Sequence, residues 1–96
     1  MAQYELTRRA RSDIAGIAQY SETNWGLARA NKYLDALETS MRRLAANPLM
    51  SRPRDDLRVG LRSFGVQSHI IYFRTRGKAI VIVRVLHMAQ DPSLHL

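Results

Sequence analysis

Apolar and small residues in the first half of the chain recur at helical spacing. One stripe runs through residues 10–25 at intervals of 4, 3, 4 and 4 and consists of Ala10, Ile14, Ile17, Ser21 and Trp25. A second stripe in residues 30–44 consists of Ala30, Tyr33, Leu34, Leu37, Met41 and Leu44. Gly26 separates the stripes, Thr7 is a favourable start for the first helix, and Asn47-Pro48 ends the second. The pattern predicts a helical hairpin.

After residue 60 the pattern changes to the two-residue period of strands. Segments 61–64, 66–73 and 79–87 are rich in Val, Ile, Phe and Tyr, and residues 4–6 alternate briefly in the same way. Gly77, within the tetrapeptide 75–78, suits a tight hairpin turn. Residues 49–60 contain Pro53, Gly60 and two adjacent aspartates, which predicts a loop.

These elements predict one α+β domain over residues 1–96, in the order β-α-α-β-β-β. The helical hairpin has to bury its apolar stripes, so we expect it on one face of a small antiparallel sheet. The other face and the edges of the sheet are then left for solvent or for partners. Trp25, at the end of the first stripe, should pack under the hairpin corner, with an exposed partner-binding position as the alternative.

The last predicted strand is apolar on both faces, which predicts a central strand that is covered on both sides. Strict alternation places Ile80, Ile82, Arg84 and Leu86 on one face, and Val81, Val83, Val85 and His87 on the other. Arg84 interrupts the first row. It can form an internal ion pair, to Asp91 or the terminal carboxylate, or hold a phosphate or carboxylate of a partner.

Composition excludes several classes of protein. The chain of 96 residues is 46% hydrophobic and lacks cysteine, which rules out disulfides and thiolate chemistry and fits the cytoplasm. No apolar run is long enough for a membrane span or a signal peptide. We therefore expect a cytoplasmic protein without membrane contact.

The net positive charge of the chain comes from its second half. Residues 1–41 hold five basic and five acidic side chains, whereas residues 42–96 hold ten basic and three acidic ones, which accounts for the net charge of +7. Lys32 and Lys78 are the only lysines, and arginine favours bidentate contacts with carboxylates and phosphates. The second half therefore suits an acidic partner, nucleic acid or protein, although a merely solvated basic face has the same composition.

The sequence offers partner-binding residues more readily than a catalytic set. Three strands in register could bring Arg62, Arg74 and Arg84 onto one surface, and His87 and His95 follow the last strand. Metal-free RNA cleavage also needs a general base and a general acid, and no two histidines among His69, His87 and His95 have a spacing that forces them together. No phosphate loop or metal-ligand cluster is present, and Asp55-Asp56 reads as a turn. We predict no cofactor, no metal and no catalysis.

An ordered set of short motifs resembles the ParE toxins of the RelE/ParE superfamily of bacterial toxin–antitoxin modules. The set comprises YELT (4–7), Ala10, DIAGI (13–17), Tyr20, Asn24-Trp25-Gly26, Ala30, Tyr33, LAANP (44–48), Leu57-Arg58, Gly60-Leu61-Arg62, Ser68-His69, Ile71-Tyr72, Ile82, Arg84-Val85-Leu86-His87, Asp91 and His95-Leu96. One departure is Arg8, which stands where the family's LTPxA start has proline. That proline is favoured in a first helical turn but is not required.

The resemblance implies a RelE/ParE-like fold, a ParD-like antitoxin that neutralises by direct binding, and DNA gyrase as the target. It implies no sequence-specific DNA binding by the toxin alone. Arg62 and Arg84 lie at positions resembling two arginines of the RelE branch, which cleaves mRNA on the ribosome. That branch is the alternative, but this chain has no tyrosine after Tyr72 and lacks the lysine-rich loop. A third hypothesis is a toxin fold that has lost toxicity and only binds its partner.

Overall fold

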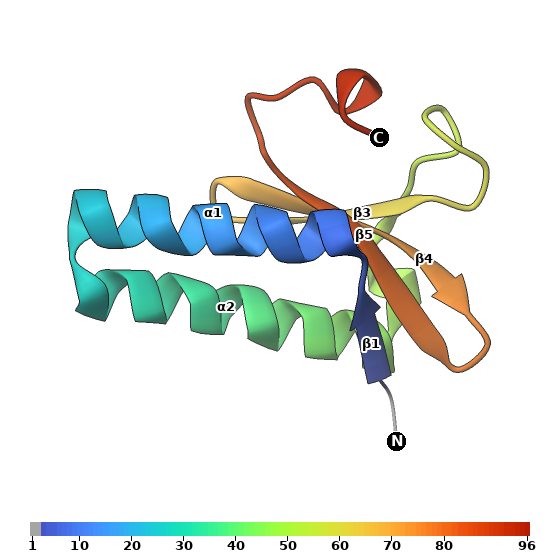
Figure 1. Ribbon diagram of the computed structural model, residues 1–96. Helices are drawn as coiled ribbons and strands as arrows, with labels where there is room; N and C mark the ends of the chain where they lie inside the picture. Colours follow the sequence, from blue (N-terminus) through green and yellow to red (C-terminus); the bar gives the residue numbers. More distant parts are fainter. Residues whose placement is uncertain (1–2) are drawn as a thin grey trace.

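The computed structural model describes residues 3–96 and shows two long helices against one face of a five-stranded sheet (Figure 1). The helices are α1 (Arg8–Trp25) and α2 (Leu27–Ala46). The strands are β1 (Gln3–Leu6), β2 (Arg52–Pro53), β3 (Arg62–Val66), β4 (His69–Arg76) and β5 (Ala79–His87). Short 3-10 turns occupy Pro48–Met50 and Pro92–Leu94. The predicted α+β class and element order are confirmed, with the two-residue β2 as an addition.

The sheet is mixed, whereas the sequence predicted an antiparallel one. Its strand order is β1-β5-β4-β3-β2, and β1 pairs parallel to β5, with Leu6 opposite Ile82. All other neighbours are antiparallel. A short alternating segment can pair in either direction. The pattern of residues 4–6 therefore could not predict that this strand would pair parallel to the last one.

The helix ends are set by the residues that the sequence singled out. The Thr7 hydroxyl accepts a hydrogen bond from the Ala10 N–H at 3.0 Å and donates one to the Val83 carbonyl at 2.8 Å, so it caps α1 and ties it to β5. Gly26 lies between the helices with φ 87°, a region that glycine adopts without strain. The second helix ends at Ala46, directly before Asn47-Pro48.

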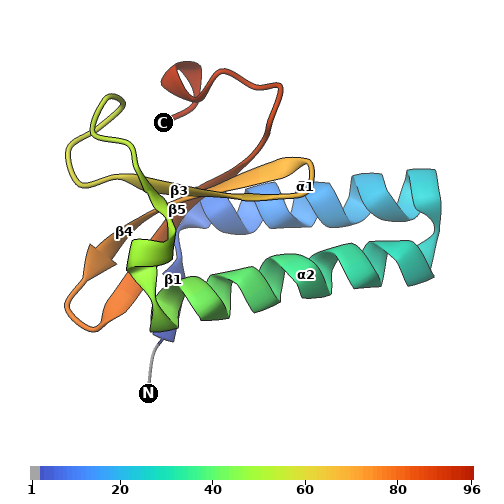
Figure 2. The same cartoon turned by 180° about the vertical axis from the view of Figure 1, so that it is seen from behind.

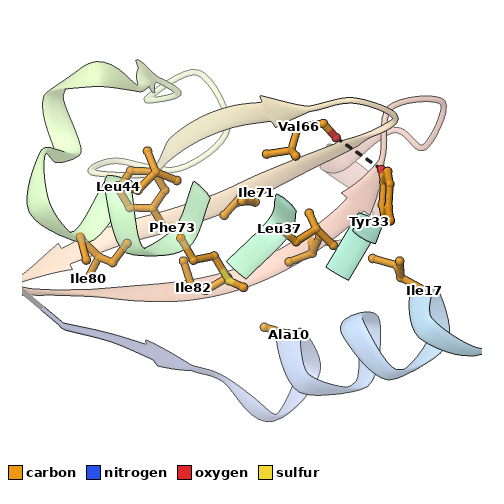
Figure 3. Close-up of a cluster of buried hydrophobic side chains, with 13 residues drawn as sticks. Ala10, Ile17, Tyr33, Leu37, Leu44, Val66, Ile71, Phe73, Ile80 and Ile82 are labelled. Carbon is orange, nitrogen blue, oxygen red and sulfur yellow. Dashed lines mark hydrogen bonds between the residues drawn. The ribbon is translucent and has the colours of Figure 1, made fainter. Parts of the chain in front are cut away.

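The main core lies between the helical hairpin and the sheet (Figure 3). Both predicted helical stripes face it, and their buried members include Ala10, Ile17, Leu37 and Leu44. The sheet contributes Val66, Ile71, Phe73, Ile80, Ile82 and Val85. Burial of this apolar surface is the main stabilisation of the fold. Within residues 3–96, no helix combines the length and the apolar character that a membrane crossing needs.

The opposite face of the sheet carries a second, smaller core, which differs from the prediction of an open face. Leu61, Tyr72 and Leu86 form its centre. Leu57, from the loop before β3, and Leu96, from the C-terminal tail, pack against it. Figure 2 shows that loop and the tail on the side of the sheet away from the helices. The bare face predicted from the element order is therefore partly covered by irregular segments.

Two local features of the strands depart from the predicted ranges. The predicted strand 66–73 is interrupted because Gln67, with φ 51°, and Ser68 form a turn between β3 and β4. In β5 the register shifts, with Phe73 opposite Ile82 but Tyr72 opposite Arg84, so Val83 is the extra residue of a bulge. Strict alternation therefore fails after Ile82. Val85 joins the helix-side core, whereas Leu86 joins the second core. The prediction that both faces of the strand are covered is confirmed.

Candidate partner-binding site

Arg84 is held by an internal ion pair. Its Nε and Nη2 donate to the two carboxylate oxygens of Asp13 in α1, at 2.7 and 2.8 Å, and its Nη1 donates to the carbonyl of His95 in the tail. Both side chains of the pair are largely buried. The predicted ion pair is present, but the partner is Asp13 and not Asp91 or the chain terminus. Asp91 instead accepts from the Ser93 N–H and caps the last 3-10 turn.

The same contacts close the free edge of β5. Beyond Ile82 this strand has no neighbour on its β1 side, so its outward N–H groups need other acceptors. Asp13 Oδ2 accepts from the Val85 N–H at 3.0 Å, and Gln90 Oε1 accepts from the His87 N–H at 2.9 Å. Arg9 also donates to the His95 carbonyl, at 3.0 Å. We call Asp13, Arg84 and the His95 carbonyl the tail clamp.

The three arginines do not share a surface, so this prediction is wrong. Arg62 lies opposite Phe73 and donates to the Oγ and carbonyl oxygens of Ser51, at 2.7 and 2.9 Å. Arg74 is exposed and follows Phe73 in β4, so it points to the other face of the sheet. The β5 bulge places Arg84 opposite Tyr72, a residue of the second core, and from there its guanidinium reaches Asp13 of α1. Only Arg74 of the three is left exposed to a partner.

The strand register brings together two histidines that the sequence did not connect. His69 of β4 lies directly opposite His87 of β5, with ring centroids 5.3 Å apart. The Tyr33 hydroxyl lies 2.6 Å from His69 Nδ1 and accepts from the Ser68 N–H at 3.2 Å. Burial raises the pKa of Tyr33, which keeps the hydroxyl protonated at neutral pH. His95 contributes its backbone carbonyl to the tail clamp.

Five rings form a continuous row from the hairpin corner to the end of β5. Successive centroid distances are 6.1 Å for Tyr20 and Trp25, 5.9 Å for Trp25 and Tyr33, 5.5 Å for Tyr33 and His69, and 5.3 Å for His69 and His87. Trp25 is 38% exposed, so its predicted core position is wrong. Figure 1 shows that the corner between α1 and α2 projects past the end of the sheet, so no strand of residues 3–96 lies under it.

A groove of about 440 Å³ runs beside this row, between α1 and the ends of β4 and β5. We call this groove the ring groove, because Tyr20, Trp25, His69 and His87 line one side of it. Gly16, one turn before Tyr20 in α1, also lines this groove, and an added Cβ there would meet no atom within 4 Å. The lining is mostly apolar and aromatic, which suits the apolar anchors of a protein partner. Within residues 3–96, no three His, Asp or Glu side chains are grouped to hold a metal ion.

Acid should destabilise the fold through His69. Burial, and then the neighbouring His87, lower the pKa of His69, against a smaller opposing effect of Asp13. As pH falls through about 6.5, the unfolded chain takes up this proton before the folded chain does. The free energy of unfolding, measured in urea, should therefore decrease between pH 7.5 and 5.5. A His69→Gln variant should show a shallower decrease, and an equal one would contradict this assignment.

Comparison with known proteins identifies the family. The model of the family described as "ParE toxin of type II toxin-antitoxin system, parDE" matches residues 4–92. The chain is 36% identical to Toxin ParE1 of Caulobacter vibrioides, over 100% of this chain and 99% of that protein. It is 32% identical to Toxin ParE1 of Mycobacterium tuberculosis, over 99% and 98% of the two chains. Toxin ParE of Escherichia coli is also 32% identical, over 95% and 89%.

Solved structures show the same fold. A chain of the chromosomal ParDE toxin–antitoxin system from P. aeruginosa superposes with a TM-score of 0.77 at 22% identity, over 91% of this chain and 96% of that one. A chain of the toxin–antitoxin complex RelBE2 from Mycobacterium tuberculosis superposes with a TM-score of 0.63 at 21% identity, over 93% of both chains. With the family match over nearly the whole sequence, the chain belongs to the ParE toxins of type II toxin–antitoxin systems.

Proposed function

We propose that this chain inhibits growth by binding DNA gyrase, without cleaving any bond, and that a ParD-like antitoxin silences it by direct binding in the cytoplasm. The observation that carries the non-enzymatic part is the tail clamp. Cleavage of RNA needs a cation at the developing phosphorane charge beside an acid and a base. Arg84 is one of the two arginines at positions resembling those of the RelE branch, and its guanidinium is occupied by Asp13 and the His95 carbonyl.

The ring groove is the proposed site for an apolar segment of the antitoxin. Trp25 and Tyr20 are both exposed beside it, and tryptophan and tyrosine are the side chains that most often dominate the energy of protein interfaces. Arg29 lies 5.5 Å from the centre of the indole ring, which adds a cation at the rim. An amphipathic helix with acidic flanks fits both features, and the net charge of +7 would speed its association.

One observation favours ribosome-dependent mRNA cleavage as a second candidate. His69 and His87 lie side by side at the groove, and two histidines can serve as base and acid in RNA cleavage. His69 is held to Tyr33 and its pKa is lowered by burial, which favours the neutral form. A neutral histidine can act as a base, so this pair needs a direct experiment.

Two assays on the purified chain separate the candidates. We expect the chain to reduce supercoiling by gyrase, and an equimolar antitoxin to restore it. We expect a ribosome-bound mRNA to remain intact in a translating extract at the same concentration. Cleavage of that mRNA at defined codons, lost in a His87→Ala or His69→Gln variant, would replace the gyrase proposal by the second candidate.

A further inference from the structure

The loop before β3 presents an apolar side chain to solvent in a fixed conformation. Val59, at the tip, is 91% exposed. The loop around it is closed by hydrogen bonds: Arg54 makes two contacts of 3.1 Å to the Asp56 carboxylate, and the Gly60 N–H donates to Asp55 Oδ1 at 2.9 Å. The Arg54 N–H also donates to the Leu61 carbonyl at 2.7 Å. A segment ordered in advance loses little conformational entropy when it binds.

The C-terminal tail is built in the same way and lies beside this loop. Leu57 of the loop and Leu96 of the tail both pack into the second core, over Tyr72 and Leu86. Val59 and Leu94, two residues away from these anchors, point outward instead, and Leu94 is 77% exposed. Arg9 and Arg84 both donate hydrogen bonds to the His95 carbonyl, which fixes the end of the tail. Each segment thus uses one apolar residue as an anchor and exposes another.

The tip of the loop carries a guanidinium that no carboxylate of the loop pairs. Asp56 is paired with Arg54, and Asp55 is bound to the backbone of Gly60, so both carboxylates are engaged inside the loop. Arg58, next to Val59, is exposed and makes no salt bridge within residues 3–96. The tip therefore combines an apolar side chain with an available guanidinium.

We infer that Val59, Arg58 and Leu94 form a second binding surface, for a protein surface that offers an apolar pocket and a carboxylate for Arg58, and that this surface contacts the target of the toxin. The inference rests on the proposed toxin function and adds to it the place of target contact. A protein fits better than nucleic acid because neither segment contains Phe, Tyr or Trp, the side chains on which bases stack. The surface and the helical hairpin lie on opposite sides of the sheet (Figures 1 and 2).

The experiment compares Val59→Asp with two controls. Val59→Ile keeps the apolar tip, and Leu49→Asp removes another exposed apolar residue, 79% exposed, in the turn after α2. All three changes lie at exposed positions, so the melting temperature should stay within about 4 °C of wild type. Val59→Asp should raise the toxin level needed for growth arrest at least about tenfold, with antitoxin affinity changed less than about twofold. Both controls should behave as wild type.

The outcomes distinguish this inference from the function on which it rests. Unchanged growth arrest by Val59→Asp, or an equal loss in Leu49→Asp, would overturn the second surface while leaving the gyrase proposal intact. A tenfold loss of antitoxin affinity in Val59→Asp would assign the surface to the antitoxin instead. If Val59→Asp loses growth arrest but the wild-type chain leaves gyrase supercoiling unaffected, the surface stands and gyrase falls as the target. A wild-type chain that does not arrest growth would overturn both.

Discussion

Replacing Trp25 by alanine should weaken antitoxin binding by at least about 30-fold, which corresponds to about 2 kcal/mol, the usual threshold for a dominant interface residue. The indole is 38% exposed at the ring groove and contacts Tyr20 and Tyr33 edge to face. Its removal takes away the largest side chain that lines the groove. Because the indole is partly exposed, the free energy of unfolding should fall by less than the roughly 3 to 5 kcal/mol that truncation of a buried aromatic side chain costs.

Leu27 provides the matched control for this variant. It begins α2 only two residues from Trp25, is 60% exposed, and is not among the residues that line the ring groove. Leu27→Ala should leave antitoxin affinity within about twofold of wild type, as expected for a surface position outside an interface core. Calorimetric titration of antitoxin into each variant, with urea unfolding alongside, measures both quantities. Large destabilisation with unchanged affinity would return Trp25 to the core position that the sequence suggested.

The helices were the predictable part of this fold because their signals are local. Periodic burial of Ala10, Ile17, Leu37 and Leu44, and the cap formed by Thr7, depend on residues at most a few positions apart. The strand boundary at Gln67 was not predictable in the same way. Its positive φ is stabilised by a hydrogen bond from the next N–H to Tyr33, a residue of the second helix.

The candidate site depends on the contacts that a sequence pattern does not encode. One extra residue at Val83 changes the direction of every later side chain in β5, and alternation cannot show where a bulge falls. The pairing of His69 with His87 follows from that register. Asp13 is distant in sequence from Arg84, and nothing near either residue marks the other as its partner. A search for carboxylates in the helices facing β5 is the one signal that could have found it.

The tail clamp should make Arg84 a determinant of stability. Arg84→Ala leaves the largely buried Asp13 carboxylate without its cation. Asp13→Ala leaves the Arg84 guanidinium without its carboxylate and the Val85 N–H without its acceptor. Removal of one partner from a buried pair costs about 3 to 5 kcal/mol, and we expect about 3 kcal/mol here because some solvent reaches both groups. Urea unfolding at pH 7 measures this loss directly.

The exposed Arg76–Glu5 pair is the control that shows how much of the stability loss depends on burial of the ion pair. It joins β4 to β1 at 3.1 Å, but both side chains are more than half exposed, so Arg76→Ala should cost less than about 1 kcal/mol. Equal losses in Arg84→Ala and Arg76→Ala would show that the clamp contributes no more than a surface pair. A double variant, Asp13→Leu with Arg84→Met, should recover part of the stability because it leaves no unpaired buried charge.

The same double variant tests what the clamp does for the tail. Without Arg84, the His95 carbonyl keeps only its contact from Arg9, so the backbone amides of residues 94–96 should exchange with solvent faster than in wild type. If the tail belongs to the toxic surface, growth arrest should then weaken even though the double variant is folded. Because Asp13 also lines the ring groove, antitoxin affinity is measured alongside. Faster exchange together with full growth arrest would separate the clamp from toxicity and leave Arg84 with a role in stability alone.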